Sequence, residues 1–202
     1  MNYLNVAQAA ETIGLPKGEN NEAFRRTFQE ATQIEIPITK DGSLSATSAG
    51  KRFSFLRGVD IPARVDEGLI DLGVAGTDAF LEYDKWNNLS TEEIGEAICR
   101  FSVLANKEAG AKLGRLFSSR RTSSMVLLPT SRRRMLNMLA AIKDLPVAAM
   151  DLSITGSVEE YANLTGSGAV ADIVGTGRTA RAQGLDEIEE LKKIYTCLGW
   201  KR

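Results

Sequence analysis

The residues best suited to chemistry follow a short apolar stretch in the C-terminal part of the chain. Ala169–Val174 is apolar except for Asp172, and the residues after it are Gly175, Thr176, Gly177, Arg178 and Thr179. The glycines permit positive φ and close backbone approach, so the amides of residues 175–179 can converge on an anion. The threonine hydroxyls, Arg178 or Arg181, and the dipole of a following helix all favour negative charge. Asp172 suits a sugar diol or a metal ion, so the pattern predicts a ligand with a phosphate and hydroxyls, such as a phosphorylated sugar.

This chemistry requires a strand that ends near Val174 and a helix that begins after the glycines. A second stretch, Asp71–Asp78, has the same order of acid, aliphatic residue, glycine and polar residue. Gly76 stands as far after Asp71 as Gly177 stands after Asp172. The repetition suits two lobes built on similar strand–loop–helix units, each with glycines at the carboxyl end of a strand, where open α/β sheets bind ligands.

Hydrophobic periodicity predicts strands that alternate with helices along the chain. The expected strands lie at 11–15, 34–38, 52–57, 69–76, 92–105, 124–128, 147–152 and 169–174. The expected helices lie at 19–31, 61–67, 107–117 and 131–143. Further helices are expected to begin near 78 and near 157, and one that follows the glycine loop is expected to end near 183. Asp60, and Ser157 with Glu160, are expected helix caps, and 41–43 is an expected turn.

The fold class predicted from this alternation is α/β, with two lobes of mainly parallel sheet flanked by helices, like a periplasmic binding protein. Residues 1–98 plus 186–202 are expected to form lobe 1, and residues 99–185 to form lobe 2. Extended crossings near 92–105 and 185–196 are expected to join the lobes, and the acidic-to-basic segment after Asp186 reads as a tail.

Composition excludes several classes of protein. The 202 residues are 43% hydrophobic and 25% charged, as in ordinary globular proteins, and the net charge of −1 gives no basic field for nucleic acid or an anionic membrane. The arginines at 120–121 and 132–134 read as solvated helix faces. No apolar run approaches a membrane span, no signal peptide is evident, and two cysteines suggest a reduced, cytoplasmic setting. The chain has no histidine, so chemistry must rest on carboxylates, Lys, Arg, hydroxyls and amides.

The window around Asp172 resembles the phosphoribosyl-pyrophosphate signature of ATP phosphoribosyltransferases. Its positions are filled in register by Asp172, Ile173, Thr176, Gly177 and Thr179, with Ala180 where the family prefers Leu or Met. Further pieces resemble the family in the same order: Leu15–Gly18, Leu56–Pro62, Asp71–Asp78, Cys99–Arg100 and Gly156–Glu159. The chain departs from the family at Glu19, at Gly58 after Arg57, and before Asp172, where the family often has a second acid.

The resemblance implies the first step of histidine biosynthesis: transfer of phosphoribosyl from phosphoribosyl pyrophosphate to N1 of ATP, with release of pyrophosphate and with Mg²⁺ as cofactor. The residues it implies as catalytic are Asp172, which could also touch the metal, Lys17 and Arg57. Those it implies as substrate-binding are Gly175, Thr176, Gly177, Arg178, Thr179, Glu159 and Arg100. The length resembles the short form, which implies a homo-oligomer and a histidyl-tRNA-synthetase-like regulatory subunit.

Simpler interpretations stand beside these roles. The glycine loop can be a plain turn, Lys17 a solvated turn lysine, and Arg57 a surface arginine. Glu159 is also explained by the dipole of its helix, and Asp71 and Asp78 by the shaping of their loop. At the level of function, the alternatives are an intracellular two-lobed small-ligand binding protein and a non-catalytic paralogue of the family.

Overall fold

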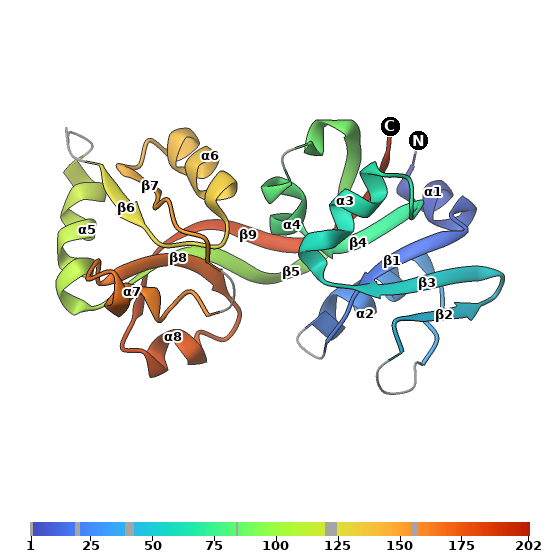
Figure 1. Ribbon diagram of the computed structural model, residues 1–202, viewed down its shortest axis with the longest axis horizontal. Coiled ribbons are helices and arrows are strands. Elements are labelled where there is room, and N and C mark those ends of the chain that lie inside the picture. The colour runs from blue at the N-terminus through green and yellow to red at the C-terminus, as the bar shows by residue number, and fades with distance from the viewer. Residues whose placement is uncertain (1, 19–20, 39–42, 84, 120–124, 155–156) are drawn as a thin grey trace. The chain divides into compact units, whose positions relative to one another are not determined.

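The computed structural model describes residues 2–18, 21–38, 43–83, 85–119, 125–154 and 157–202. These residues form two compact units. Unit 1 comprises Met1–Ile98 and Ile194–Arg202, and unit 2 comprises Cys99–Lys193. The strands β5 (Leu89–Ala105) and β9 (Asp186–Lys201) contribute residues to both units and lie side by side in Figure 1.

Unit 1 is built on a parallel core of strands. The order in the seven-stranded sheet is β2-β3-β1-β4-β9-β5-β8. Strand β1 (Thr12–Pro16) pairs in parallel with β3 (Lys51–Leu56) and with β4 (Leu72–Gly76). Antiparallel strands flank this core: β2 (Ser45–Ser48) pairs with β3, and β9 pairs with β4. The carboxyl ends of β1, β3 and β4 therefore lie at one edge, as a ligand-binding α/β sheet requires.

Helices cover both faces of this core because side chains alternate along each strand. On one face, Leu72 and Val74 pack in a cluster with Phe28 of α2 (Glu22–Thr32) and Ala7 of α1 (Tyr3–Ala9). On the other face, Ala75 packs with α3 (Ile61–Asp66) and α4 (Thr77–Glu82). Gly73 allows the close approach of α3, since a Cβ there would lie 2.5 Å from Ile61 Cγ2.

Unit 2 contains the remaining elements. Strand β8 (Ala169–Val174) pairs antiparallel with β5, and β6 (Val126–Leu128) pairs in parallel with β7 (Val147–Ala149). The helices are α5 (Lys107–Ser119), α6 (Arg133–Lys143), α7 (Tyr161–Leu164) and α8 (Arg178–Ala182). Leu104 of β5 and Val170 and Val174 of β8 share a buried cluster with residues of α7 and α8. The predicted α/β class with two lobes of sheet flanked by helices is confirmed, with a sheet that is mixed.

Several local predictions are wrong. Residues 34–38 form no strand: Gln33 ends α2 in the left-handed region with φ 59°, Ile34 is buried, and Ile38 is fully exposed. Residues 45–48, for which no strand was predicted, form strand β2. Asp60, and Ser157 with Glu160, make no side-chain caps, and α7 begins only at Tyr161. The turn at 41–42 and the arginines at 120–121 lie outside the described residues.

The largest difference between the predicted and the observed structure is in the C-terminal segment. Residues 186–201 form strand β9, so the extended crossing expected near 185–196 is confirmed and the expectation of a tail is wrong. Residues 186–193 also belong to unit 2, not to the first lobe. The reason is visible in their contacts: Glu187 bonds to Arg100 and Ser102, and Lys143 Nζ donates to the carbonyl of Glu190.

Asp71 ties β4 to β1 at the amino ends of these strands. Its Oδ2 accepts hydrogen bonds from the backbone amides of Glu11 and Thr12 and from Thr12 Oγ1 at 2.8–3.0 Å. Burial raises the pKa of Asp71, but these hydrogen bonds outweigh burial and hold the pKa below its usual value of 3.8. A depressed pKa means that the stabilisation is present above pH 3.8 and is lost as the pH falls through the lower value of the folded state.

We expect Asp71→Asn to lower the free energy of unfolding by about 1–2 kcal/mol at pH 7, because a charged acceptor is lost. The difference from the wild type should shrink below pH 3.8, where the wild-type carboxylate also becomes protonated. Urea unfolding at several pH values measures both quantities. Glu108→Gln is the control, since Glu108 pairs with Lys112 on an exposed helix face. A difference that stays constant down to the lowest pH would contradict the assignment.

Thr196 is a polar residue in the core of unit 1. It is fully buried opposite Gly76 in the β4–β9 pair, and its hydroxyl has no hydrogen-bond partner among the described residues. Replacing an unsatisfied buried hydroxyl by a methyl group of similar size removes a desolvation cost. Thr196→Val should therefore raise the free energy of unfolding by about 1 kcal/mol in a urea titration. Thr32→Val is the matched control and should destabilise, because the Thr32 hydroxyl donates to the carbonyl of Phe28 at 2.8 Å.

Candidate active site

The predicted phosphate loop of unit 2 connects β8 to α8. Strand β8 ends at Val174 and α8 begins at Arg178, with Gly177 as N-cap in the left-handed region at φ 69°. Gly175 has no positive φ, and a Cβ there would meet nothing within 4 Å. Of the two glycines, only Gly177 is therefore required by the backbone conformation.

Two arginines hold successive carbonyls of this loop. Arg100 Nη1 donates to the carbonyl of Gly175 at 3.1 Å, and Arg181 Nη2 donates to the carbonyl of Thr176 at 3.0 Å. In a trans peptide the C=O and the following N–H point in opposite directions. The amides of residues 176 and 177 therefore point away from the guanidinium groups that hold these carbonyls.

Arg100 was predicted to contact substrate, but here its guanidinium is engaged within unit 2. Its Nε donates to Glu187 Oε1 at 2.6 Å, its Nη2 donates to Glu187 Oε2, and Ser102 Oγ donates to the same carboxylate at 2.6 Å. The hydrogen bonds from Arg100 lower the pKa of Glu187, and those to Glu187 raise the pKa of Arg100. Glu187 and Ser102 were not predicted, because nothing in the spacing of residues 100, 102 and 187 indicates that they meet.

Asp172 lies next to this group of residues. It is half-buried on β8, directly opposite the fully buried Ser102 in the antiparallel β5–β8 register. Directly opposed residues of an antiparallel pair share one face of the sheet. Asp172 and Ser102 are therefore on the same face, and the loop begins shortly beyond Asp172.

Arg178, Thr179 and Glu159 complete the predicted unit 2 residues. Arg178 and Thr179 are exposed in the first turn of α8, and the amide of Arg178 approaches Thr176 Oγ1 at 3.4 Å. Glu159 is buried, with 9% of its surface exposed, just before α7. Gly156 of the same motif lies outside the described residues. The predicted repetition of a strand–loop–helix unit is confirmed, since Gly76 and Gly177 are the N-caps of α4 and α8.

In unit 1, Lys17 and Arg57 follow the carboxyl ends of β1 and β3. Both side chains are exposed. The Lys17 turn is fixed from α2, because Arg25 Nη1 donates to the carbonyls of Pro16 at 2.6 Å and Gly18 at 3.0 Å. Arg57 precedes a 3₁₀ turn at Gly58–Asp60, which its carbonyl closes by accepting from the amide of Asp60 at 2.9 Å.

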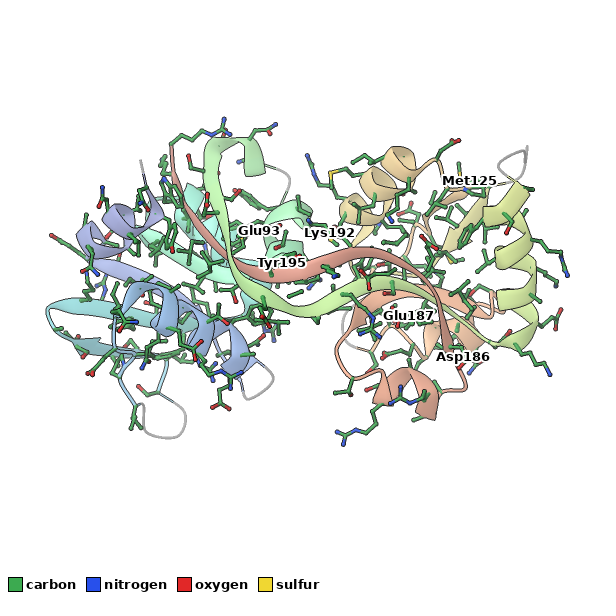
Figure 2. All side chains as sticks on the ribbon, turned by 180° about the vertical axis from the view of Figure 1, so that it is seen from behind. Glu93, Met125, Asp186, Glu187, Lys192 and Tyr195 are labelled. Carbon is green, nitrogen blue, oxygen red and sulfur yellow. The ribbon has the colours of Figure 1, made fainter. Side chains whose placement is uncertain are left out.

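The loop after β4 is the third strand end in unit 1. Thr77 Oγ1 donates to Glu93 Oε1 at 3.1 Å and accepts from the amide of Tyr195 at 3.3 Å. Glu93 on β5 and Tyr195 on β9 are labelled in Figure 2. Asp78 is buried beside this loop, and a Cβ on Gly76 would lie 2.2 Å from Asp78 Oδ1. Asp78 thus shapes the loop, as the simpler interpretation expected, whereas Asp71 lies at the opposite end of β4.

Two observations bear on metals and membranes. Within the described ranges, no group of three or more His, Cys, Asp or Glu side chains could hold a metal ion. Across the same residues, no helix has the length and apolar character that crossing a bilayer requires.

Comparison with known proteins identifies the family. The model of the family described as HisG: ATP phosphoribosyltransferase matches residues 57–202. The chain belongs to the ATP phosphoribosyltransferase family. It is 32% identical to the ATP phosphoribosyltransferase of Aquifex aeolicus, over 92% of this chain and 82% of that protein. It is 28% identical to that of Shouchella clausii, over 91% of this chain and 81% of that protein.

Solved structures agree with the fold. The chain is similar to the "ATP phosphoribosyl transferase (HisG:HisZ) complex from Thermotoga maritima" with a TM-score of 0.65 and 21% identity, over 94% of this chain and 86% of that chain. The predicted enzyme class, a pentosyltransferase that performs the first step of histidine biosynthesis, is confirmed by the family membership.

The two loop glycines offer a direct test of the geometry. We expect Gly177→Ala to lower the free energy of unfolding by about 1–2 kcal/mol, because Ala is strained at positive φ. Its Cβ would also lie 3.0 Å from Arg181 Nη1. Gly175→Ala is the matched control and should leave thermal unfolding at the wild-type temperature, since its site is open. Equal effects of the two substitutions would show that the left-handed conformation of residue 177 is not required.

Proposed function

We propose that the chain transfers the phosphoribosyl group of phosphoribosyl pyrophosphate to N1 of ATP, using the loop 175–179 to bind the 5-phosphate. The observation that carries the proposal is the arrangement of this loop. Its carbonyls at 175 and 176 are held by arginines, so the amides at 176 and 177 point elsewhere. Successive backbone N–H groups in a turn that contains a residue in the left-handed conformation form a concave site that can bind a phosphate.

The remaining unit 2 roles follow from position. Thr176 and Thr179 supply hydroxyl donors to the phosphate, and Arg178, exposed at the loop, supplies positive charge. Asp172, half-buried on β8 before the loop, accepts hydrogen bonds from the ribose hydroxyls. Holding the ribose at both ends orients C1 for in-line displacement, in which the N1–C1 bond forms as the bond from C1 to pyrophosphate breaks. We also propose that Glu159 contacts the substrate.

In unit 1 the proposed ligands are anionic groups. Lys17 and Arg57 stand at the ends of adjacent parallel strands, and both are exposed. We assign them to pyrophosphate or to the nucleotide phosphates, where positive charge stabilises the leaving group. Arg25 supports this role indirectly, because it fixes the carbonyls on both sides of Lys17.

Mg²⁺ is the proposed cofactor. Magnesium in such enzymes is bound by one or two carboxylates, waters and substrate phosphates, and it neutralises charge on the leaving group. The donor set of this chain fits that mode at one point, since Asp172, half-buried on β8 just before the loop, can supply a single carboxylate. Asp172 and the phosphates of the substrate would hold the ion.

The proposed setting is the cytoplasm, with a homo-oligomer that works beside a histidyl-tRNA-synthetase-like regulatory subunit. The similar structure from Thermotoga maritima is a HisG:HisZ complex, and its two components support a partner of this kind.

The test is pyrophosphate release from ATP and phosphoribosyl pyrophosphate with Mg²⁺, with and without such a subunit. We expect Asp172→Asn to lower kcat/KM about 100-fold, because the ribose loses a charged acceptor, and Thr176→Ala to lower it about tenfold. Thr47→Ala, at an exposed position of β2, is the control. Thermal stabilisation by the ligands without release of pyrophosphate, even with the subunit, would favour a binding protein or a non-catalytic paralogue.

A further inference from the structure

We propose that Arg100 and Arg181 are positioning residues that preset the loop 175–177 for the phosphate of the sugar, with Glu187 holding Arg100 in place. The inference deepens the proposed function and rests on it. Neither arginine is assigned to the ligand; each is assigned to a backbone carbonyl of the loop.

The Arg100 guanidinium uses its donors on two different partners. Its Nε and Nη2 donate to Glu187 and its Nη1 donates to the carbonyl of Gly175. A guanidinium carries its donors in one fixed plane, so fixing two of them on a carboxylate fixes the direction of the third. Glu187 thereby determines where Arg100 holds the Gly175 carbonyl.

Glu187 is itself held in place by a second residue of β5. Ser102 is fully buried and donates to Glu187 Oε1 at 2.6 Å, so the carboxylate is held from two positions on β5. Arg100 and Ser102 lie two residues apart on one face of that strand. Figure 2 places Glu187 on β9, which neighbours β5 in the sheet. All three residues stand on strands, and groups on strands are held more precisely than groups on loops.

The two arginines together fix the direction of the loop peptides. The Gly175 carbonyl is held by Arg100 and the Thr176 carbonyl by Arg181, at 3.1 and 3.0 Å. Because each trans peptide is planar, these two bonds fix the directions of two consecutive N–H groups. Ordering the loop before the ligand arrives removes an entropic cost of binding, so the brace formed by Arg100, Glu187 and Arg181 should act on affinity for the sugar phosphate and not on the rate of displacement.

The experiment compares two brace variants, Glu187→Gln and Arg100→Lys, with a matched control on the same strand, Glu189→Gln. Glu189 pairs with Lys143 of α6 at 3.8 Å, whereas the carboxylate that holds Arg100 is that of Glu187. Steady-state kinetics should show KM for phosphoribosyl pyrophosphate raised about tenfold in both brace variants, the change expected from one charge-assisted hydrogen bond. Values of kcat and KM for ATP should match the wild type, and Glu189→Gln should match it throughout.

A second measurement needs no ligand. Backbone ¹⁵N order parameters of residues 175–177 should fall toward the flexible range, below about 0.6, in the brace variants and stay near the wild-type value in Glu189→Gln. Unchanged order parameters, or an unchanged KM for phosphoribosyl pyrophosphate, in folded brace variants would overturn the inference. If the order parameters fall but the wild type releases no pyrophosphate, the brace stands as a structural device and the proposed function fails.

Discussion

The pairing of β9 with its neighbours is the constraint on which the rest of the molecule depends. This strand, the last in the chain, lies between β4 and β5 in the sheet. In unit 1 it closes the hydrophobic core through Leu198 and contacts Thr77 at the end of β4 through the backbone of Tyr195. In unit 2 it delivers Glu187 to Arg100. Residues of β9 therefore contribute contacts to the surroundings of both glycine loops.

Features encoded locally could be predicted from the sequence. The apolar runs 72–76 and 169–174 are strands, and the glycine five positions after the acid of each stretch, Gly76 after Asp71 and Gly177 after Asp172, is a helix N-cap. These signals need only side-chain periodicity and the conformational freedom of glycine, which are properties of neighbouring residues. The loop 175–179 and its strand were found for the same reason, and the resemblance carried by that loop pointed to the family to which the chain belongs.

Features set by long-range partners could not be predicted. The alternating isoleucines at 34–38 have the pattern of a strand, but a strand also needs a neighbour, and Gln33 turns the chain away in the left-handed region. An extended crossing was expected near 185–196, but the mixed charges after Asp186 also suggested a tail, and nothing in them indicates the pairing with β4 that makes 186–201 a central strand. The resemblance implied Arg100 as a substrate-binding residue, but its partner Glu187 stands 87 positions away in the sequence and was not predicted. No local rule relates two such positions.

The placement of charge around the loop bears on how a phosphate would be recognised. Of the arginines near it, Arg100 is neutralised by Glu187, and Arg181 turns back onto the Thr176 carbonyl. Positive charge that holds carbonyls contributes to the ligand mainly by aiming the amides on the other side of the same peptides. In the proposed role of the loop, backbone donors would therefore fix the orientation of the phosphate, and the exposed Arg178 would supply positive charge beside them.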